Sequence, residues 1–171
     1  MIFWLFILLL FFFTLVLSFI SLAPWLPTYA RDLERIKKIV DLQTGEKFCE
    51  LGCGNGRVLL YLAKHFPNNQ FVGVELALPL FVICKTRQWS SSLNNVTFKL
   101  KSLYRENFQD VDVVYVFGMR DKMAGKFREK LEREMKSGSR VISYVFLIEG
   151  LEPAHIDKGG EKDVSIYVYQ F

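Results

Sequence analysis

The residues of this 171-residue chain that are best suited to chemistry lie in one short, glycine-rich stretch. Glu50 is followed by three glycines at alternate positions, Gly52, Gly54 and Gly56, and then by the apolar run 58–63. This pattern predicts a strand, a tight turn and the start of a helix. Glycines allow a positive φ and a close approach of a ligand, and a helix N-terminus offers N–H groups to an anion. We therefore expect the functional centre in this turn.

The spacing of the glycines separates two classes of ligand. A dinucleotide-binding turn has the pattern G-x-G-x-x-G/A, but this chain has Arg57 where the third small residue should stand. Arg57 could bind a carboxylate or be solvated. The pattern, E-x-G-x-G-x-G, resembles motif I of class I S-adenosylmethionine (SAM) methyltransferases; a glycine turn of another α/β protein is the alternative. The resemblance implies SAM as the cofactor, bound by Glu50, Gly52, Gly54, Asn55 and Gly56.

A second acidic residue, Glu75, closes the apolar strand predicted over 70–75. An acid at the carboxyl end of such a strand can accept hydrogen bonds from both ribose hydroxyls of a nucleoside, although a solvated strand end is the alternative. Methyltransferases commonly place an aspartate after the third strand, where this chain has Ser102. By the same resemblance Leu76, Ser102 and Leu103 join the expected cofactor-binding residues.

From residue 45 onward, predicted strands and helices alternate. This order indicates an α/β fold in which helices cover both faces of a parallel sheet, with ligands at the carboxyl ends of the strands. We expect a Rossmann-like class I methyltransferase sandwich, mostly parallel, with an antiparallel last strand. Six predicted strands, where such sheets usually have seven, suggest a trimmed sheet. The strands are expected at 47–51, 70–75, 96–100, 111–117, 140–148 and 164–170, and the helices at 29–42, 56–66, 79–91 and 120–136.

Residues 1–22 contain no charged side chain. A helix of that length is ~33 Å long, enough to cross a bilayer core of ~30 Å. Interfacial aromatics and basic residues follow it, so the positive-inside rule places the rest of the chain in the cytoplasm or the mitochondrial matrix. We therefore expect a single-pass membrane protein; a cleaved signal peptide is the alternative. The expected parts are a transmembrane anchor over 1–23, a juxtamembrane amphipathic connector over 24–44 and the methyltransferase domain over 45–171.

Charge and cysteine content limit the other partners. The net charge is +4, which is too modest to indicate nucleic acid. The three cysteines, Cys49, Cys53 and Cys84, are odd in number and form no C-x-x-C pair. They indicate neither a disulfide framework nor a metal site, so we expect no metal. From the modest charge we expect no nucleic-acid partner.

A closer resemblance rests on the apolar N-terminal segment, Pro27-Thr28, the block 50–57, the block 72–76 and the block 113–118. Together they resemble the membrane-anchored protein-lysine methyltransferases that act on the adenine nucleotide translocase and the ATP synthase c subunit, and their prokaryotic relatives. The resemblance implies N-methylation of lysine in a membrane-associated protein. The alternatives are a lipid, quinone or other small-molecule acceptor, and a non-catalytic SAM-binding module. An RNA methyltransferase is disfavoured because N/D-P-P-Y/F is missing after the fourth strand.

Methyl transfer to lysine needs a neutral amine, and aromatic groups can stabilise the transferring cationic methyl. No general base is evident in the sequence. The aromatic candidates near the predicted strand ends are Tyr29, Tyr104, Phe117 and Phe146, although the sequence favours a core role over a catalytic one for each of them.

Overall fold

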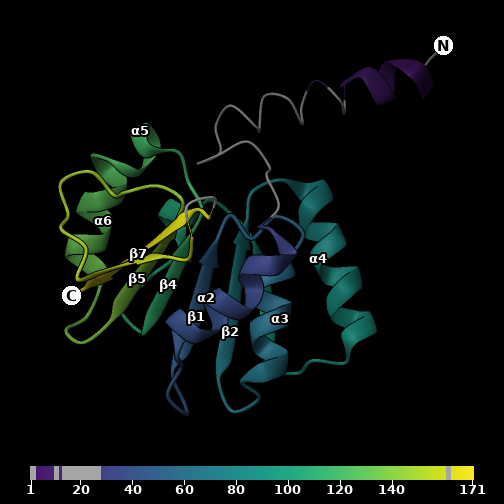
Figure 1. The fold of residues 1–171 in the computed structure, drawn as a ribbon. Helices are drawn as coiled ribbons and strands as arrows, with labels where there is room; N and C mark the ends of the chain where they lie inside the picture. Colours follow the sequence, from purple (N-terminus) through teal and green to yellow (C-terminus); the bar gives the residue numbers. More distant parts are fainter. Residues whose placement is uncertain (1–2, 10–11, 13–27, 161–162) are drawn as a thin grey trace.

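The protein is seen in a computed structural model, which describes residues 3–9, 12, 28–160 and 163–171. A seven-stranded sheet forms its centre, with the strand order β3-β2-β1-β4-β5-β7-β6 (Figure 1). The strands are β1 (Lys47–Leu51), β2 (Gln70–Glu75), β3 (Val96–Leu100), β4 (Val113–Val116), β5 (Arg140–Tyr144), β6 (His155–Lys158) and β7 (Ser165–Gln170).

The first five strands are parallel to one another, and β7 runs antiparallel to both β5 and β6. The predicted mostly parallel sheet with an antiparallel last strand is confirmed. The expectation of a trimmed, six-stranded sheet is wrong, because β6 forms within the segment between the last two predicted strands. This strand reads His155-Ile156-Asp157-Lys158 and lies at the edge of the sheet beside β7. Because one of its four residues is a large apolar one, it has no apolar alternation that a sequence pattern could reveal.

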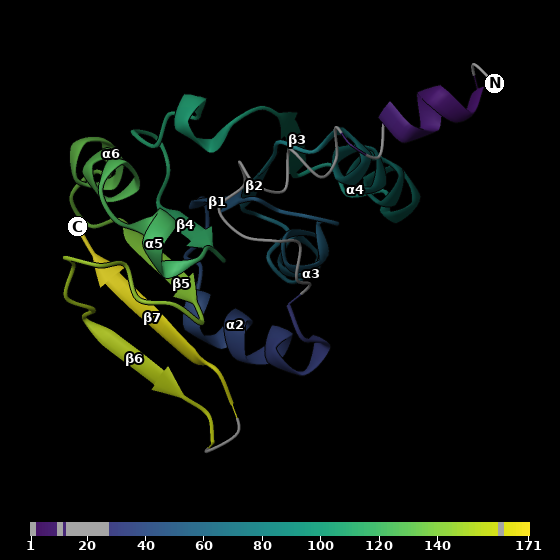
Figure 2. The same ribbon diagram turned by 90° about the horizontal axis from the view of Figure 1, so that it is seen from above.

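Helices cover both faces of the sheet (Figure 2). One face packs against α2 (Leu33–Val40), α3 (Arg57–His65) and α4 (Leu78–Ser91), and the other packs against α6 (Lys126–Glu134). The short helices are η1 (Ala30–Asp32), η2 (Leu103–Arg105) and α5 (Arg120–Met123). Ile36 and Val40 of α2 are fully buried, so the predicted amphipathic connector packs on the domain core in this region.

The predicted helix 120–136 is interrupted. Ala124 is extended and Gly125 has φ 54° and ψ −119°, so the chain forms α5 and α6 in place of one helix. The apolar residues four apart still belong to the hydrophobic core between α6 and the sheet, since Met123, Phe127 and Leu131 are fully buried. The apolar period is therefore a good guide to burial but not to the continuity of the helix.

The predicted transmembrane anchor falls largely on residues 10–11 and 13–23, which lie outside the described residues. Within the described part of the chain, no helix combines the length and the apolarity needed to cross a bilayer. The helical stretch 3–9 spans only ~10 Å, against a hydrocarbon core of ~30 Å. The prediction of a single-pass membrane protein with its domain on the cytoplasmic or matrix side is therefore wrong for the residues that the structure describes.

Candidate active site

The glycine turn follows β1 directly and lies at the carboxyl end of the sheet. The backbone is left-handed at Gly52, Gly54 and Gly56, with φ of 68°, 56° and 69°. Only glycine adopts this region without a steric cost, which explains why glycines recur at alternate positions. The predicted strand, turn and helix are confirmed as β1, the turn and α3.

Two of these glycines have opposite surroundings. A Cβ atom on Gly56 would lie 2.9 Å from Cζ of Phe98 and 3.3 Å from Sγ of Cys84. A Cβ on Gly52 would meet nothing within 4 Å. Gly56 therefore allows the turn to pack against β3 and α4, while Gly52 borders open space from which a ligand can approach the backbone.

Glu75 ties this turn to the end of β2. Its Oε2 accepts a hydrogen bond from the Gly54 N–H (2.8 Å), and its Oε1 accepts from the N–H groups of Leu76 (2.9 Å) and Ala77 (2.8 Å). Burial raises the pKa of Glu75, and the three N–H donors act in the opposite direction. A carboxylate has about four lone-pair sites, so Oε2 keeps the capacity to accept one further hydrogen bond from a ligand hydroxyl.

Glu50 caps the helix that follows the turn. Its Oε2 accepts from the Leu59 N–H (3.0 Å) in the first turn of α3, and Asn55 Oδ1 accepts from the Arg57 N–H (3.2 Å). The sequence suggests that these N–H groups face an anionic ligand, but the protein uses them itself. Glu50 therefore orients the turn. Burial raises its pKa well above the usual range.

Two arginine side chains donate hydrogen bonds to backbone oxygens in and near the glycine turn. Arg57 Nη1 donates to the backbone oxygen of Thr28 (3.1 Å), and Arg87 Nη1 donates to that of Asn55 (2.7 Å). The sequence leaves open a solvated Arg57 or one that binds a carboxylate, and the structure shows a third arrangement. The guanidinium joins the start of α3 to the segment before η1.

The remaining predicted cofactor residues surround the ends of β2 and β3. The Lys101 N–H donates to the Glu75 backbone oxygen (3.0 Å), which brings the segment after β3 beside Glu75. Ser102 caps η2 by accepting a hydrogen bond from the Tyr104 N–H (3.4 Å). Leu103 packs against the hydrophobic core on the α6 face of the sheet. The cofactor contacts of Leu76, Ser102 and Leu103 stay predictions.

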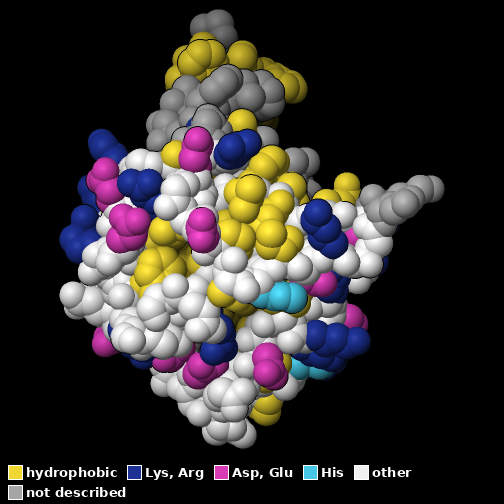
Figure 3. Space-filling model, turned by 60° about the vertical axis from the view of Figure 1, so that its left-hand side comes forward, with side chains coloured by type: hydrophobic (Ala, Val, Ile, Leu, Met, Phe, Trp, Pro, Cys, Tyr) yellow, Lys and Arg dark blue, Asp and Glu magenta, His cyan; other side chains and the backbone are white. Residues whose placement is uncertain are grey.

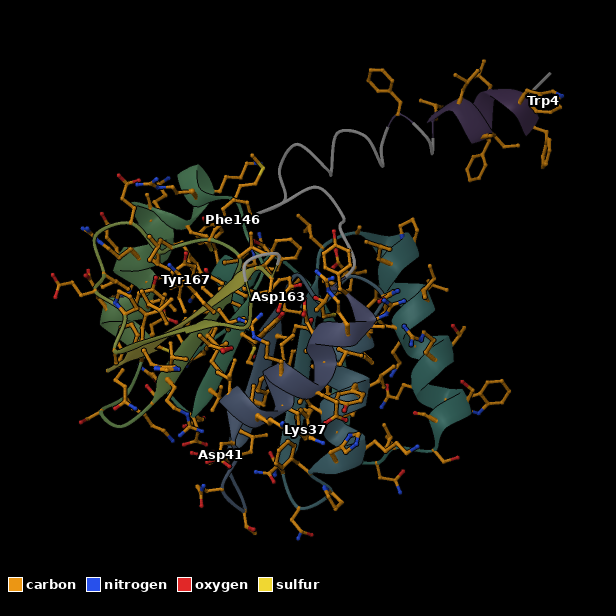
Figure 4. The ribbon with its side chains drawn as sticks, in the orientation of Figure 1. Trp4, Lys37, Asp41, Phe146, Asp163 and Tyr167 are labelled. Carbon is orange, nitrogen blue, oxygen red and sulfur yellow. The ribbon has the colours of Figure 1, made fainter. Side chains whose placement is uncertain are left out.

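Of the four aromatic candidates, the structure brings two together. The rings of Phe117 and Phe146, which follow β4 and β5, are stacked with their centroids 6.3 Å apart. Figure 4 shows Phe146 at the end of the sheet to which the parallel strands point. Tyr29 is 58% exposed and packs under the guanidinium of Arg31. Tyr104 follows β3, which two strands separate from β4.

Three residues beside these rings, Tyr115, Tyr144 and Asp32, do not stand out in the sequence. Tyr144, the last residue of β5, packs edge-on against Phe117 (5.2 Å between centroids), and its ring lies 6.5 Å from that of Tyr115. The Tyr144 hydroxyl donates to Oδ2 of Asp32 (2.6 Å), and Tyr115, Tyr144 and Asp32 are all buried. The available signal is a tyrosine near the end of each of the two strands β4 and β5. Nothing in the sequence links either one to Asp32.

A strained turn places Phe146 in this group. Val145 has φ 76°, a rare conformation for a β-branched residue. The turn is closed by Ser143 Oγ, which donates to the Phe146 backbone oxygen (2.6 Å), and by the Val145 N–H, which donates to the Ser165 backbone oxygen (2.9 Å).

On the side of the molecule that carries β5 to β7, hydrophobic side chains gather among charged ones (Figure 3).

This sheet order, with its antiparallel β7 and a glycine turn beside two buried acids, defines a class I SAM-dependent methyltransferase. Residues 50–155 match the family model described as the ANTKMT methyltransferase domain, and the chain belongs to that family. It is a SAM-dependent methyltransferase. The open face at Gly52 and the remaining acceptor capacity of Glu75 fit SAM as its cofactor.

Two curated relatives resemble most of the chain. A protein-lysine N-methyltransferase of Saccharolobus islandicus (strain REY15A) is 29% identical over 161 residues, which cover 90% of this chain and 96% of the relative. The lysine N-methyltransferase of Rattus norvegicus that is named for the ATP synthase c subunit is 29% identical over 146 residues. That match covers 84% of this chain but 65% of the rat protein.

A solved structure supports the fold independently. The crystal structure of an RNA methyltransferase from Salinibacter ruber, in complex with S-adenosyl-L-homocysteine, superposes with a TM-score of 0.78. The match covers 85% of this chain and 93% of that one, at 20% sequence identity. At this identity the likeness establishes the fold and leaves the acceptor to be argued separately.

Proposed function

We propose that this enzyme methylates the ε-amine of lysine in a protein, and that the acceptor protein is associated with a membrane. The observation that carries the proposal is the resemblance to the protein-lysine N-methyltransferase of S. islandicus, which extends over nearly the whole of both chains. The membrane-associated acceptor is supported by the rat relative, whose name gives the ATP synthase c subunit as its substrate. We further propose that residues 45–171 hold the cofactor.

The site residues support a division of roles. We propose that the turn around Gly52 and the carboxylate of Glu75 hold SAM, with Leu76, Ser102 and Leu103 beside them. SAM, when bound, supplies a methyl group activated by a sulfonium. The acceptor nitrogen uses its lone pair to form the N–C bond as the C–S bond breaks, and the bonding electrons remain on sulfur.

The acceptor amine has to be neutral for this step. A free lysine has a pKa of about 10.4 and is protonated at neutral pH. Burial in apolar surroundings favours the neutral form. The rings of Phe117, Tyr144 and Phe146 provide such surroundings at the ends of β4 and β5, next to the strand that carries the glycine turn.

The experiment is a test of where the methyl group goes. Purified enzyme is incubated with radiolabelled SAM and with membranes from cells that lack the gene, and protein, lipid and RNA are then separated. We expect label in the protein fraction, and loss of that label with Glu75→Ala. A Lys85→Ala variant, altered on the exposed surface of α4, serves as the control and should label normally. Label confined to lipid would favour a small-molecule acceptor and would refute the proposal.

A further inference from the structure

The rings at the ends of β4 and β5, together with Asp32, are called the acceptor side below, and they contain a buried polar group that the fold itself does not explain. The hydroxyl of Tyr115 lies near the side chain of Thr28, whose interaction with it acts to lower the Tyr115 pKa, but among the described residues no group makes a hydrogen bond of normal geometry with it. Tyr115 is only 1% exposed. A buried hydroxyl without a partner costs about 1–3 kcal/mol, so such groups are rare and call for a ligand or another reason.

A buried carboxylate lies in the same place. Asp32 is 3% exposed, and its Oδ2 accepts the hydrogen bond from Tyr144. Its ion pair with Arg31 is long, at 3.9 Å from Nε to Oδ1, and the arginine side chain is 58% exposed. Exposed pairs of this kind contribute little, so Arg31 neutralises the carboxylate only weakly. A buried charge of this sort is stabilised when a cation with N–H donors lies beside it.

These groups lie beside the cofactor turn. Tyr115 of β4 is the register partner of Glu50 in β1, and Glu50 leads directly into the glycine turn. Neighbouring strands are about 4.8 Å apart, so the tyrosine is one strand away from the turn. An amine held there is close to the carboxyl ends of both strands.

The aromatic rings connect this place to the surface. From the half-buried stacked pair Phe146 and Phe117, the contacts continue to Tyr144 and then to Tyr115, which are both buried. The series is apolar at its rim and ends in two hydroxyls and a carboxylate. A lysine side chain has the matching form, since it carries an ammonium on a four-carbon apolar stem.

We propose that Asp32, Tyr115 and Tyr144 form the binding site for the acceptor's primary ammonium group, with the aromatic rings along its alkyl stem. The inference rests on the proposed lysine acceptor and names the residues that would receive it. The Asp32 carboxylate attracts the ammonium as it enters and takes up the proton that has to leave before methyl transfer, and the Tyr115 hydroxyl oxygen accepts one N–H. Tyr144 holds the carboxylate in place while its ring faces the stem.

The probe is n-butylammonium, which has the stem and charge of lysine, and n-butanol is its uncharged control. Binding is measured by calorimetry with S-adenosylhomocysteine present. We expect wild-type protein to bind the ammonium and not the alcohol. Asp32→Asn should weaken this binding about tenfold or more, because a charge-assisted contact is lost. Asp163→Asn is the matched control, since Asp163 also faces Arg31 (3.7 Å) but is more exposed, and it should bind like wild type.

Tyr115→Phe separates a binding role from a structural one. The variant removes an unpartnered hydroxyl, so the protein should be at least as stable as wild type while binding n-butylammonium several-fold more weakly. Equal n-butylammonium affinity in wild type, Asp32→Asn and Tyr115→Phe would overturn the inference. Weaker SAM binding in these variants would also overturn it, because the groups would then serve the cofactor's own ammonium.

Failure of the proposed amine site can be distinguished from failure of the proposed function. If wild-type enzyme labels no lysine, the proposed function fails regardless of the variants. If wild-type enzyme labels lysine and the variants label and bind as it does, only the amine site fails.

Discussion

The glycine turn and the proposed acceptor side lie one strand apart but are built in different ways. The turn is held by short connections around β1 and β2, such as the bond from the Gly54 N–H to Glu75, 21 residues apart. The acceptor side is held by the bond from Tyr144 to Asp32, which joins residues 112 positions apart. One half is therefore a compact unit of strand, turn and helix, while the other exists only after β4, β5 and η1 have come together.

The two halves also differ in how fully their polar groups are used. In the turn, the N–H groups of Gly54, Arg57 and Leu59 all have side-chain acceptors within the protein. On the acceptor side, the Tyr115 hydroxyl has no partner among the described residues. We infer that the turn is preorganised before SAM arrives, and that the acceptor side becomes complete only when a substrate binds.

The largest expected effect concerns the turn. Gly56→Ala should lower the free energy of unfolding by about 2–4 kcal/mol, because the new Cβ meets the Phe98 ring at 2.9 Å and has to adopt a positive φ. Gly52→Ala has only the positive φ to accommodate, so it should lose about 1 kcal/mol. It should nevertheless impair SAM binding, since its Cβ enters the open approach. Chemical denaturation and SAM titration measure both; equal stability of the two variants would contradict this account of the turn.

On the acceptor side, Tyr144→Phe should lower the free energy of unfolding by about 2 kcal/mol, because it leaves the buried Asp32 carboxylate without its donor. Its ring packing with Phe117 would be kept. SAM affinity measured without acceptor should stay close to that of wild type, because the residue belongs to the other half. A large loss of SAM affinity in a folded variant would show that the two halves are not independent.

A pH-dependent effect is expected at Glu50. Its pKa is raised by burial, so the folded state binds a proton more readily than the unfolded state, whose glutamate has a pKa of about 4.3. The contribution of Glu50 to the free energy of unfolding should therefore fall as the pH rises from about 4.3 toward the raised value. Glu50→Gln keeps an oxygen for the Leu59 N–H and removes this fall. Without ligand, it should match wild type near pH 4 and be more stable than wild type at pH 7. Parallel denaturation curves of the two proteins across this range would disprove the assignment.

The smallest effect is expected at Tyr104, which is 47% exposed and follows β3. Tyr104→Ala should change stability by about 0.5 kcal/mol or less and leave the rate of methyl transfer close to wild type. Phe117→Ala, on the acceptor side, is the comparison and should slow transfer strongly. If Tyr104→Ala were the slower enzyme, the acceptor would approach from the β3 side of the turn.

This contrast explains what the sequence could predict. The turn lies in contiguous residues with a fixed spacing, so Glu50, the three glycines and the strand ending at Glu75 are readable, and with them the fold and SAM. The Asp32–Tyr144 bond depends on the folded topology, and no local pattern marks it. The role of Arg57 is hidden for the same reason, since its partner, Thr28, lies 29 residues earlier.

Two elements escape prediction for local reasons. The edge strand β6 is mostly exposed and polar and forms by pairing with β7, so alternation could not reveal it. Gly125 interrupts a helix whose apolar period continues across the break. The anchor is inferred from an uncharged run, and the part of that run which the structure describes forms no helix long enough to cross a bilayer.

The most direct measurement is the chemical identity of the methylated residue. Protein labelled by the enzyme with radiolabelled SAM is hydrolysed completely, and the labelled amino acid is identified by chromatography against standards. The account predicts Nε-methylated lysine, absent when Glu75→Ala replaces the wild-type enzyme. Label recovered as a base-labile methyl ester, or on an amino acid other than lysine, would contradict it.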